Sequence, residues 1–185
     1  CADGSSMVTE FIYWSDYYNS IISPFYSYST GRTKETLRSS QVTCRDIDDD
    51  GYIEIPEDTS SKKQSSEITS QNWVNYGNTV LSHKCYSFSC KRDGYILVID
   101  DDDFSKVKAN YDSESRKLTI INKKNKSNVF EIVTLINSNY SVNDPKYKDY
   151  TMIMKNSGFV YLAKVNKSSD IDINIQTLKD MIKVY

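Results

Sequence analysis

The sequence predicts an α+β fold, mainly an antiparallel β-sheet with a C-terminal amphipathic helix, preceded by a β-hairpin segment that carries a calcium loop. Residues 72–185 contain a succession of short segments rich in β-branched and aromatic residues, with turn-forming residues between them. Apolar side chains recur at helical spacing over residues 174–185. A sheet of consecutive antiparallel strands needs one face covered, and a terminal amphipathic helix covers it.

Length and composition narrow the class of protein. A chain of 185 residues has the length of one domain, or of one domain and a fragment of another. The formal net charge of −2 argues against a nucleic-acid partner, which requires a concentrated basic face. No apolar run approaches the roughly 18 residues that a membrane span needs.

The N-terminal segment, residues 1–60, contains three candidate strands and one candidate helix. Residues 8–14 are rich in β-branched and aromatic side chains and predict a strand, and residues 36–44 predict a second strand that leads into the acidic loop. Residues 16–23 predict a short helix that ends before Pro24. Residues 52–56 predict a strand that Pro56 ends.

A polar stretch divides the chain. We expect a linker at residues 61–71, because this part of the sequence has few apolar side chains, and a separate C-terminal domain at 72–185. Turn signals in that domain separate candidate strands at 73–81, 83–90, 95–99, 106–111, 117–122, 128–136, 150–154 and 159–165. Asp144 and Pro145 predict a turn or two of helix.

The last twelve residues predict the helix that covers the sheet. Asn174 is a favourable N-cap. Ile175, Leu178, Ile182 and Tyr185 then recur at i, i+3, i+7 and i+10, so they form one apolar face.

The acidic loop, residues 46–54, carries the one motif with defined chemistry. Its sequence DIDDDGYIE places carboxylates at alternate positions and a glycine at the turn. We expect five ligands for one Ca²⁺ ion: the side chains of Asp46, Asp48, Asp50 and Glu54, and the backbone carbonyl of Tyr52. Hard oxygen ligands at this spacing suit Ca²⁺ better than Zn²⁺ or Mg²⁺. The alternative is an acidic turn that holds no ion.

The flanks of the loop favour a hairpin over an EF-hand. Counted from Asp46, Glu57 falls at position twelve, so the EF-hand pattern matches formally. Pro56 at position eleven prevents a regular exiting helix, and residues 41–44 resemble a strand. We therefore expect a calcium loop in a β-hairpin.

Residues 36–40 and 44–56, together with the "GY" strand at 93–98, carry a resemblance to a known group of proteins. They resemble uncharacterised secreted or lipid-anchored proteins of Gram-positive anaerobes, in which an FG-GAP/VCBS-like calcium-loop region precedes a β-rich C-terminal domain. The general form of that domain is similar to PsbP/Mog1-like sandwiches. The resemblance implies an extracytoplasmic location and an architecture, but no reaction.

The cysteines give two expectations. Cys1, followed by a short polar stretch, looks like the lipidated first residue of a mature bacterial lipoprotein; the alternative is an excised domain that begins at a cysteine. Cys44, Cys85 and Cys90 leave an odd thiol. Cys85 and Cys90 are too far apart on one strand to bridge, so we expect reduced thiols.

The functional expectation is a non-catalytic module at the cell surface or secreted, with a structural Ca²⁺ loop and a glycan or protein as partner. The aromatic side chains of residues 13–28 fit either such a binding surface or an ordinary core. Membrane contact is expected only through a lipid at Cys1. Two alternatives stay open: a hydrolase that uses the acidic loop or His83 and Cys85, and an interaction domain excised from a larger surface protein.

Overall fold

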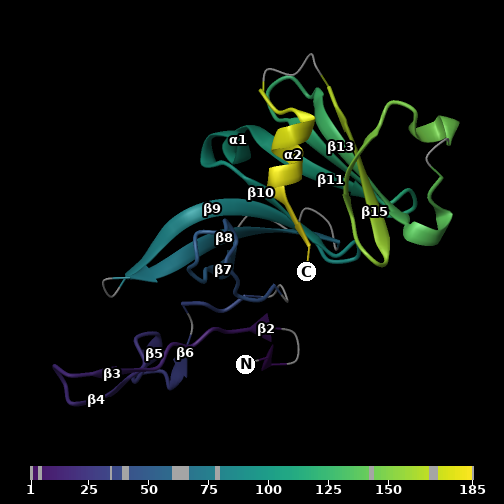
Figure 1. Cartoon of the computed structure of the whole chain (residues 1–185). Coiled ribbons are helices and arrows are strands. Elements are labelled where there is room, and N and C mark those ends of the chain that lie inside the picture. Colours follow the sequence, from purple (N-terminus) through teal and green to yellow (C-terminus); the bar gives the residue numbers. More distant parts are fainter. Residues whose placement is uncertain are drawn as a thin grey trace. The chain divides into compact units, whose positions relative to one another are not determined.

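The computed structural model describes residues 2–3, 6–33, 35–38, 42–59, 67–77, 80–141, 144–166 and 171–184. It is mainly antiparallel β-sheet, as predicted, and it divides into two compact units (Figure 1). The first unit comprises Cys1–Ser60 and Gln71–Cys85, and the second comprises Ser61–Ser70 and Tyr86–Tyr185. The division therefore falls within two long strands, β8 (Ile68–Gly77) and β9 (Val80–Cys90).

The first unit is built from short antiparallel ladders. β1 (Ala2–Asp3) pairs with β2 (Ser6–Met7), β3 (Tyr13–Ser15) with β4 (Ser20–Ile22), and β5 (Tyr26–Ser27) with β6 (Arg32–Thr33). β7 (Ile55–Asp58) pairs with β8, with Ile55 opposite Val74. A small core in this unit consists of Phe25, Ile55 and Val74, with Phe11, Cys44, Tyr76 and Leu81 packed around it.

Several predictions for the first unit are wrong. The helix expected at 16–23 is a turn followed by β4, because Asn19 adopts a positive φ of 48° and closes a hairpin in which Trp14 pairs with Ile21. The strand expected at 8–14 shrinks to β3. The strand expected at 36–44 is reduced to a bridge between Met7 and Arg38, and residues 39–41 lie outside the described residues. The strand expected at 52–56 begins later, at Ile55.

Residues 61–66 of the predicted linker at 61–71 lie outside the described residues. Its last four residues belong to β8, where Ile68 and Gln71 are buried. Gln71 pairs with Asp58 of β7, and local composition does not reveal that pairing.

The second unit contains a five-stranded antiparallel sheet in the order β11 (Val107–Asp112), β12 (Lys117–Asn122), β13 (Asn128–Ile136), β15 (Phe159–Val165), β14 (Thr151–Lys155). A second ladder pairs residues 86–90 of β9 with β10 (Tyr95–Ile99), and β10 with β16 (Ile182–Val184). The main core draws on both ladders and includes Phe88, Leu97, Leu118, Phe130 and Tyr161.

Helices are few among the described residues. α1 (Asp101–Lys106) has three aspartates in its first turn, where the positive end of the helix dipole stabilises negative charge. η1 (Asn137–Asn139) and η2 (Pro145–Tyr147) are single 3₁₀ turns, and the Asp144 side chain caps η2.

The C-terminal helix is shorter than the periodicity suggests. α2 (Ile175–Met181) packs against β14, β15 and β10 (Figure 1). The Asn174 side chain caps it by accepting hydrogen bonds from the backbone N–H groups of Gln176 and Thr177. The expected helical face through Ile182 is wrong, because Ile182 lies in β16, where pairing with β10 ends the helix.

Candidate metal site

A two-residue antiparallel bridge closes the acidic loop. The backbone N–H of Glu54 donates to the carbonyl of Arg45 at 2.9 Å, and the N–H of Arg45 donates back to the carbonyl of Glu54 at 3.2 Å. Within the loop, Asp49 and Gly51 have positive φ angles of 63° and 89°. Glycine adopts this conformation without strain and aspartate tolerates it, so the sequence favours the tight turn.

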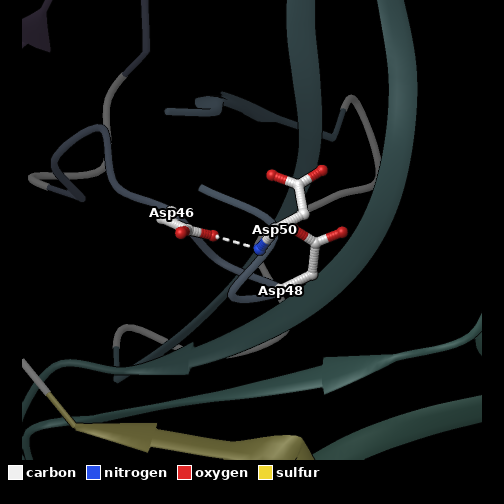
Figure 2. A group of neighbouring side chains, drawn as sticks. All are labelled: Asp46, Asp48 and Asp50. Atoms are coloured by element: carbon white, nitrogen blue, oxygen red, sulfur yellow. Dashed lines mark hydrogen bonds between the residues drawn. The ribbon is translucent and has the colours of Figure 1, made fainter. Parts of the chain in front are cut away.

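The Asp46 carboxylate organises the backbone of the loop. Its Oδ1 accepts a hydrogen bond from the N–H of Asp50 at 3.1 Å, drawn in Figure 2, and its Oδ2 accepts one from Gly51 at 2.9 Å. Asp50 Oδ1 in turn accepts from the N–H of Tyr52 at 2.9 Å. The loop is thus held in shape by the carboxylates that are the candidate ligands.

Three of the predicted ligands come together. Asp46, Asp48 and Asp50 each offer one carboxylate oxygen, and these oxygens all lie within 4.8 Å of one another (Figure 2). Asp46 is half-buried, whereas Asp48 and Asp50 are exposed. The group is of a kind that can hold a metal ion, as the alternating spacing predicted.

Glu54 lies beside this group without joining it. The side chain is fully buried; its Oε2 accepts a hydrogen bond from the Ile47 N–H at 2.9 Å, and its Oε1 has no hydrogen-bond partner among the described residues. Burial raises the pKa of this carboxyl above its ordinary value, and the negative charges of Asp48, Asp50 and Asp46 raise it further. An unsatisfied buried carboxylate oxygen favours a cation nearby.

The remaining predicted ligand is the carbonyl of Tyr52. The Tyr52 side chain is 71% exposed, and the backbone N–H binds Asp50 as described above. Cys1, the predicted lipidation residue, lies outside the described residues.

A lysine that the sequence did not indicate pairs with two of the three aspartates. Lys84, on β9, places its Nζ 3.0 Å from Asp48 Oδ2 and 2.5 Å from Asp50 Oδ2. Hydrogen bonds to Asp50 and Asp48 raise the pKa of Lys84 well above its ordinary value. The Lys84 hydrogen bond likewise lowers the pKa of Asp50, and the Tyr52 N–H adds to that effect. No local motif marks Lys84, because it lies 34 residues from Asp50 in the sequence.

His83 and Cys85, two residues of the alternative hydrolase, both lie on β9. His83 Nδ1 contacts the Asn72 side chain on the neighbouring strand. Cys44, Cys85 and Cys90 form no disulfide, in agreement with the predicted reduced thiols. A pocket of about 210 Å³ in the second unit, below the usual 300 Å³ of ligand sites, contains none of these residues; its lining is Asn128, Phe130, Glu131, Lys164, Val165 and Asn166.

The aromatic side chains of residues 13–28 are mostly on the surface. Trp14 is 58% exposed, Tyr17 87% and Tyr28 85%, and Tyr13, Tyr18 and Tyr26 are also exposed. Trp14 Nε1 donates to Asp16 Oδ1 at 3.0 Å, which fixes the indole ring at the β3–β4 turn. Phe25 alone of this stretch belongs to the core. Most of these aromatics are therefore exposed and are not part of a core.

Comparison with known proteins adds no relatives: no family model matches the chain, and neither a curated protein nor a solved structure does. None of the helices in the described ranges has the length and apolar character needed to cross a membrane.

Proposed function

We propose that this chain is a non-catalytic extracytoplasmic binding module whose acidic loop holds a structural Ca²⁺ ion. The observation that carries the proposal is the convergence of the Asp46, Asp48 and Asp50 oxygens within 4.8 Å. Bringing these carboxylates together costs Coulomb repulsion that a bound cation relieves.

The donor set favours Ca²⁺ over other common ions. The candidate ligands are all oxygens, whereas Zn²⁺ prefers nitrogen and sulfur. Ca²⁺ takes six to eight oxygen ligands in flexible geometry, while Mg²⁺ demands a regular octahedron. A short loop with carboxylates on alternate residues forms a flexible oxygen shell for Ca²⁺ more easily than a regular octahedron for Mg²⁺. Millimolar Ca²⁺ outside cells fits the location that the sequence resemblance implies.

The test is a thermal melt of chelator-treated protein with and without millimolar Ca²⁺, with Mg²⁺ for comparison. A structural ion stabilises by mass action, so we expect a Ca²⁺-specific rise of several degrees in the wild-type protein. Asp48→Ala removes a candidate ligand and leaves the Asp46 hydrogen bonds that shape the loop, so the rise is lost.

Asp149→Ala is the matched control, because Asp149 is another exposed aspartate paired with a lysine, Lys164, at 3.3 Å. It keeps the full shift. A shift that survives Asp48→Ala would place the ion elsewhere, and no shift in the wild type would leave the loop as an acidic turn.

The exposed aromatics support a second part of the proposal, a glycan or protein partner at the cell surface. Aromatic rings stack on sugar faces and supply much of the energy of protein interfaces. Trp14 is the best candidate anchor, because its hydrogen bond to Asp16 holds the ring in place before binding.

Affinity electrophoresis in gels that contain soluble cell-wall polysaccharide tests the glycan option. Retarded migration that Trp14→Ala abolishes supports a glycan; unretarded wild-type protein would redirect the search to protein partners. Tyr52→Ala, another exposed aromatic, is the control.

Location and anchoring stay predictions of the sequence. Lipidation of Cys1, with membrane contact through that lipid, is part of the proposal, as is a cell-envelope or secreted location. Likeness of residues 72–185 to PsbP/Mog1-like domains and of residues 1–60 to FG-GAP repeats also belongs to the proposal.

A further inference from the structure

The ammonium of Lys84 contacts carboxylates that are candidate ligands of a bound cation. It bridges two of the three gathered carboxylates, at 3.0 Å from Asp48 Oδ2 and 2.5 Å from Asp50 Oδ2. The three side chains of this bridge are each about one-third exposed. A lysine from a strand remote in sequence therefore supplies the positive charge that the acidic loop lacks.

A Ca²⁺ ion and this ammonium cannot share the two carboxylates. The ion binds carboxylate oxygens at about 2.3–2.6 Å, and the ammonium already lies at hydrogen-bond distance from oxygens of the same groups. Two cations held that closely repel each other strongly. At the same distance, the repulsion between a divalent ion and the ammonium is twice that between two single positive charges. One of them has to leave.

We propose that Lys84 is a built-in counter-cation that competes with Ca²⁺ for Asp48 and Asp50, so that ion binding displaces it from the acidic loop. This inference rests on the proposed calcium function of that loop. The lysine keeps the carboxylates together when no ion is bound, and it weakens calcium binding by the free energy needed to expel it. Ion binding thereby releases the contact between the loop and β9.

Glu54 indicates, independently of the three aspartates, that the lysine does not complete the site. Its buried Oε1 has no hydrogen-bond partner among the described residues, although its charge interacts with those of Asp46, Asp48 and Asp50. Of these four carboxylates, the Lys84 ammonium is paired with those of Asp48 and Asp50. A divalent cation supplies twice the charge of the lysine and accepts more oxygen ligands.

Calorimetric titration of chelator-treated protein with CaCl₂ tests the competition. We expect Lys84→Gln to bind Ca²⁺ about tenfold more tightly than wild type, because the ion no longer displaces an ammonium. Lys108→Gln, which removes an exposed lysine from β11, is the matched control and keeps the wild-type affinity.

Displacement itself is measured on the unmutated protein. An N-hydroxysuccinimide ester acetylates accessible, unpaired amines, and peptide mass spectrometry reports each lysine separately. We expect millimolar Ca²⁺ to increase acetylation of Lys84 several-fold and to leave that of Lys108 unchanged. This readout separates expulsion of the lysine from a general electrostatic effect of removing one positive charge.

The outcomes distinguish the inference from the function on which it rests. Calcium binding with equal affinity in wild type and Lys84→Gln, and with unchanged Lys84 acetylation, overturns the competition and keeps the calcium site. No binding to either protein overturns the calcium site itself. Binding to Lys84→Gln alone supports the competition and overturns a structural Ca²⁺ in the wild-type protein.

Discussion

The guanidinium of Arg116 is paired with the carboxylate of Asp93, a side chain with no solvent exposure. Arg116 Nε lies 2.7 Å and Nη2 2.6 Å from Asp93 Oδ1. The hydroxyl of Tyr111 donates to the other oxygen at 2.8 Å. The Tyr161 hydroxyl binds the Asp93 backbone carbonyl at 2.8 Å, so this residue fixes the turn between β9 and β10 to the five-stranded sheet.

Asp93→Asn is expected to destabilise the second unit by about 3 kcal/mol, because it leaves a largely buried guanidinium without its countercharge. The side chain of Arg116 is only 19% exposed, so water replaces the lost partner poorly. Urea denaturation measures the loss. Asp149→Ala, which breaks an exposed pair, is expected to cost less than about 1 kcal/mol; similar small losses in both variants would show that the Asp93 pair is not a stabilising contact.

Glu54→Gln tests two effects of the buried Glu54 charge: its effect on the stability of the ion-free protein and its effect on calcium binding. Glutamine keeps an acceptor for the Ile47 N–H. It removes the negative charge of the Glu54 carboxyl, whose pKa is raised by burial and by the neighbouring aspartates. In chelator we expect the melting temperature to rise by a few degrees, and with Ca²⁺ we expect a smaller shift than in wild type. A variant less stable than wild type in chelator would contradict this account of Glu54.

Cys90 is expected to be the least reactive of the three internal thiols. Burial, with the nearby charge of Asp93 as a second cause, raises its pKa to about 12. At pH 8 the thiolate fraction is then on the order of one in ten thousand. Iodoacetamide followed by peptide mapping should label Cys44 and Cys85, which are half-buried, before Cys90. Labelling of Cys90 at their rate in native protein would contradict its buried position.

Sequence patterns predicted the second unit far better than the first. β10, β12, β13 and β15 have the predicted bounds, because each is an apolar run between clear turn signals. The aromatic residues of the first unit gave misleading signals. Tyr17 and Tyr18 stand exposed in a hairpin turn, where pairing and a positive φ at Asn19 override local propensity.

The candidate site was predictable only in its local part. The alternating spacing of Asp46, Asp48 and Asp50 places their oxygens together through the turn alone. Glu54 was expected as a ligand, yet it lies outside that group, since its Oε2 binds the Ile47 N–H within the loop. Lys84 comes from another strand, and only the folded chain brings it to the loop.

Equilibrium dialysis of chelator-treated protein against radioactive calcium tests the central claim most directly. The account predicts saturable binding of about one ion per chain, retained by Asp149→Ala and lost in Asp48→Ala. Absence of saturable binding in the wild-type protein at millimolar Ca²⁺, or equal binding by Asp48→Ala, would contradict a calcium site in the acidic loop.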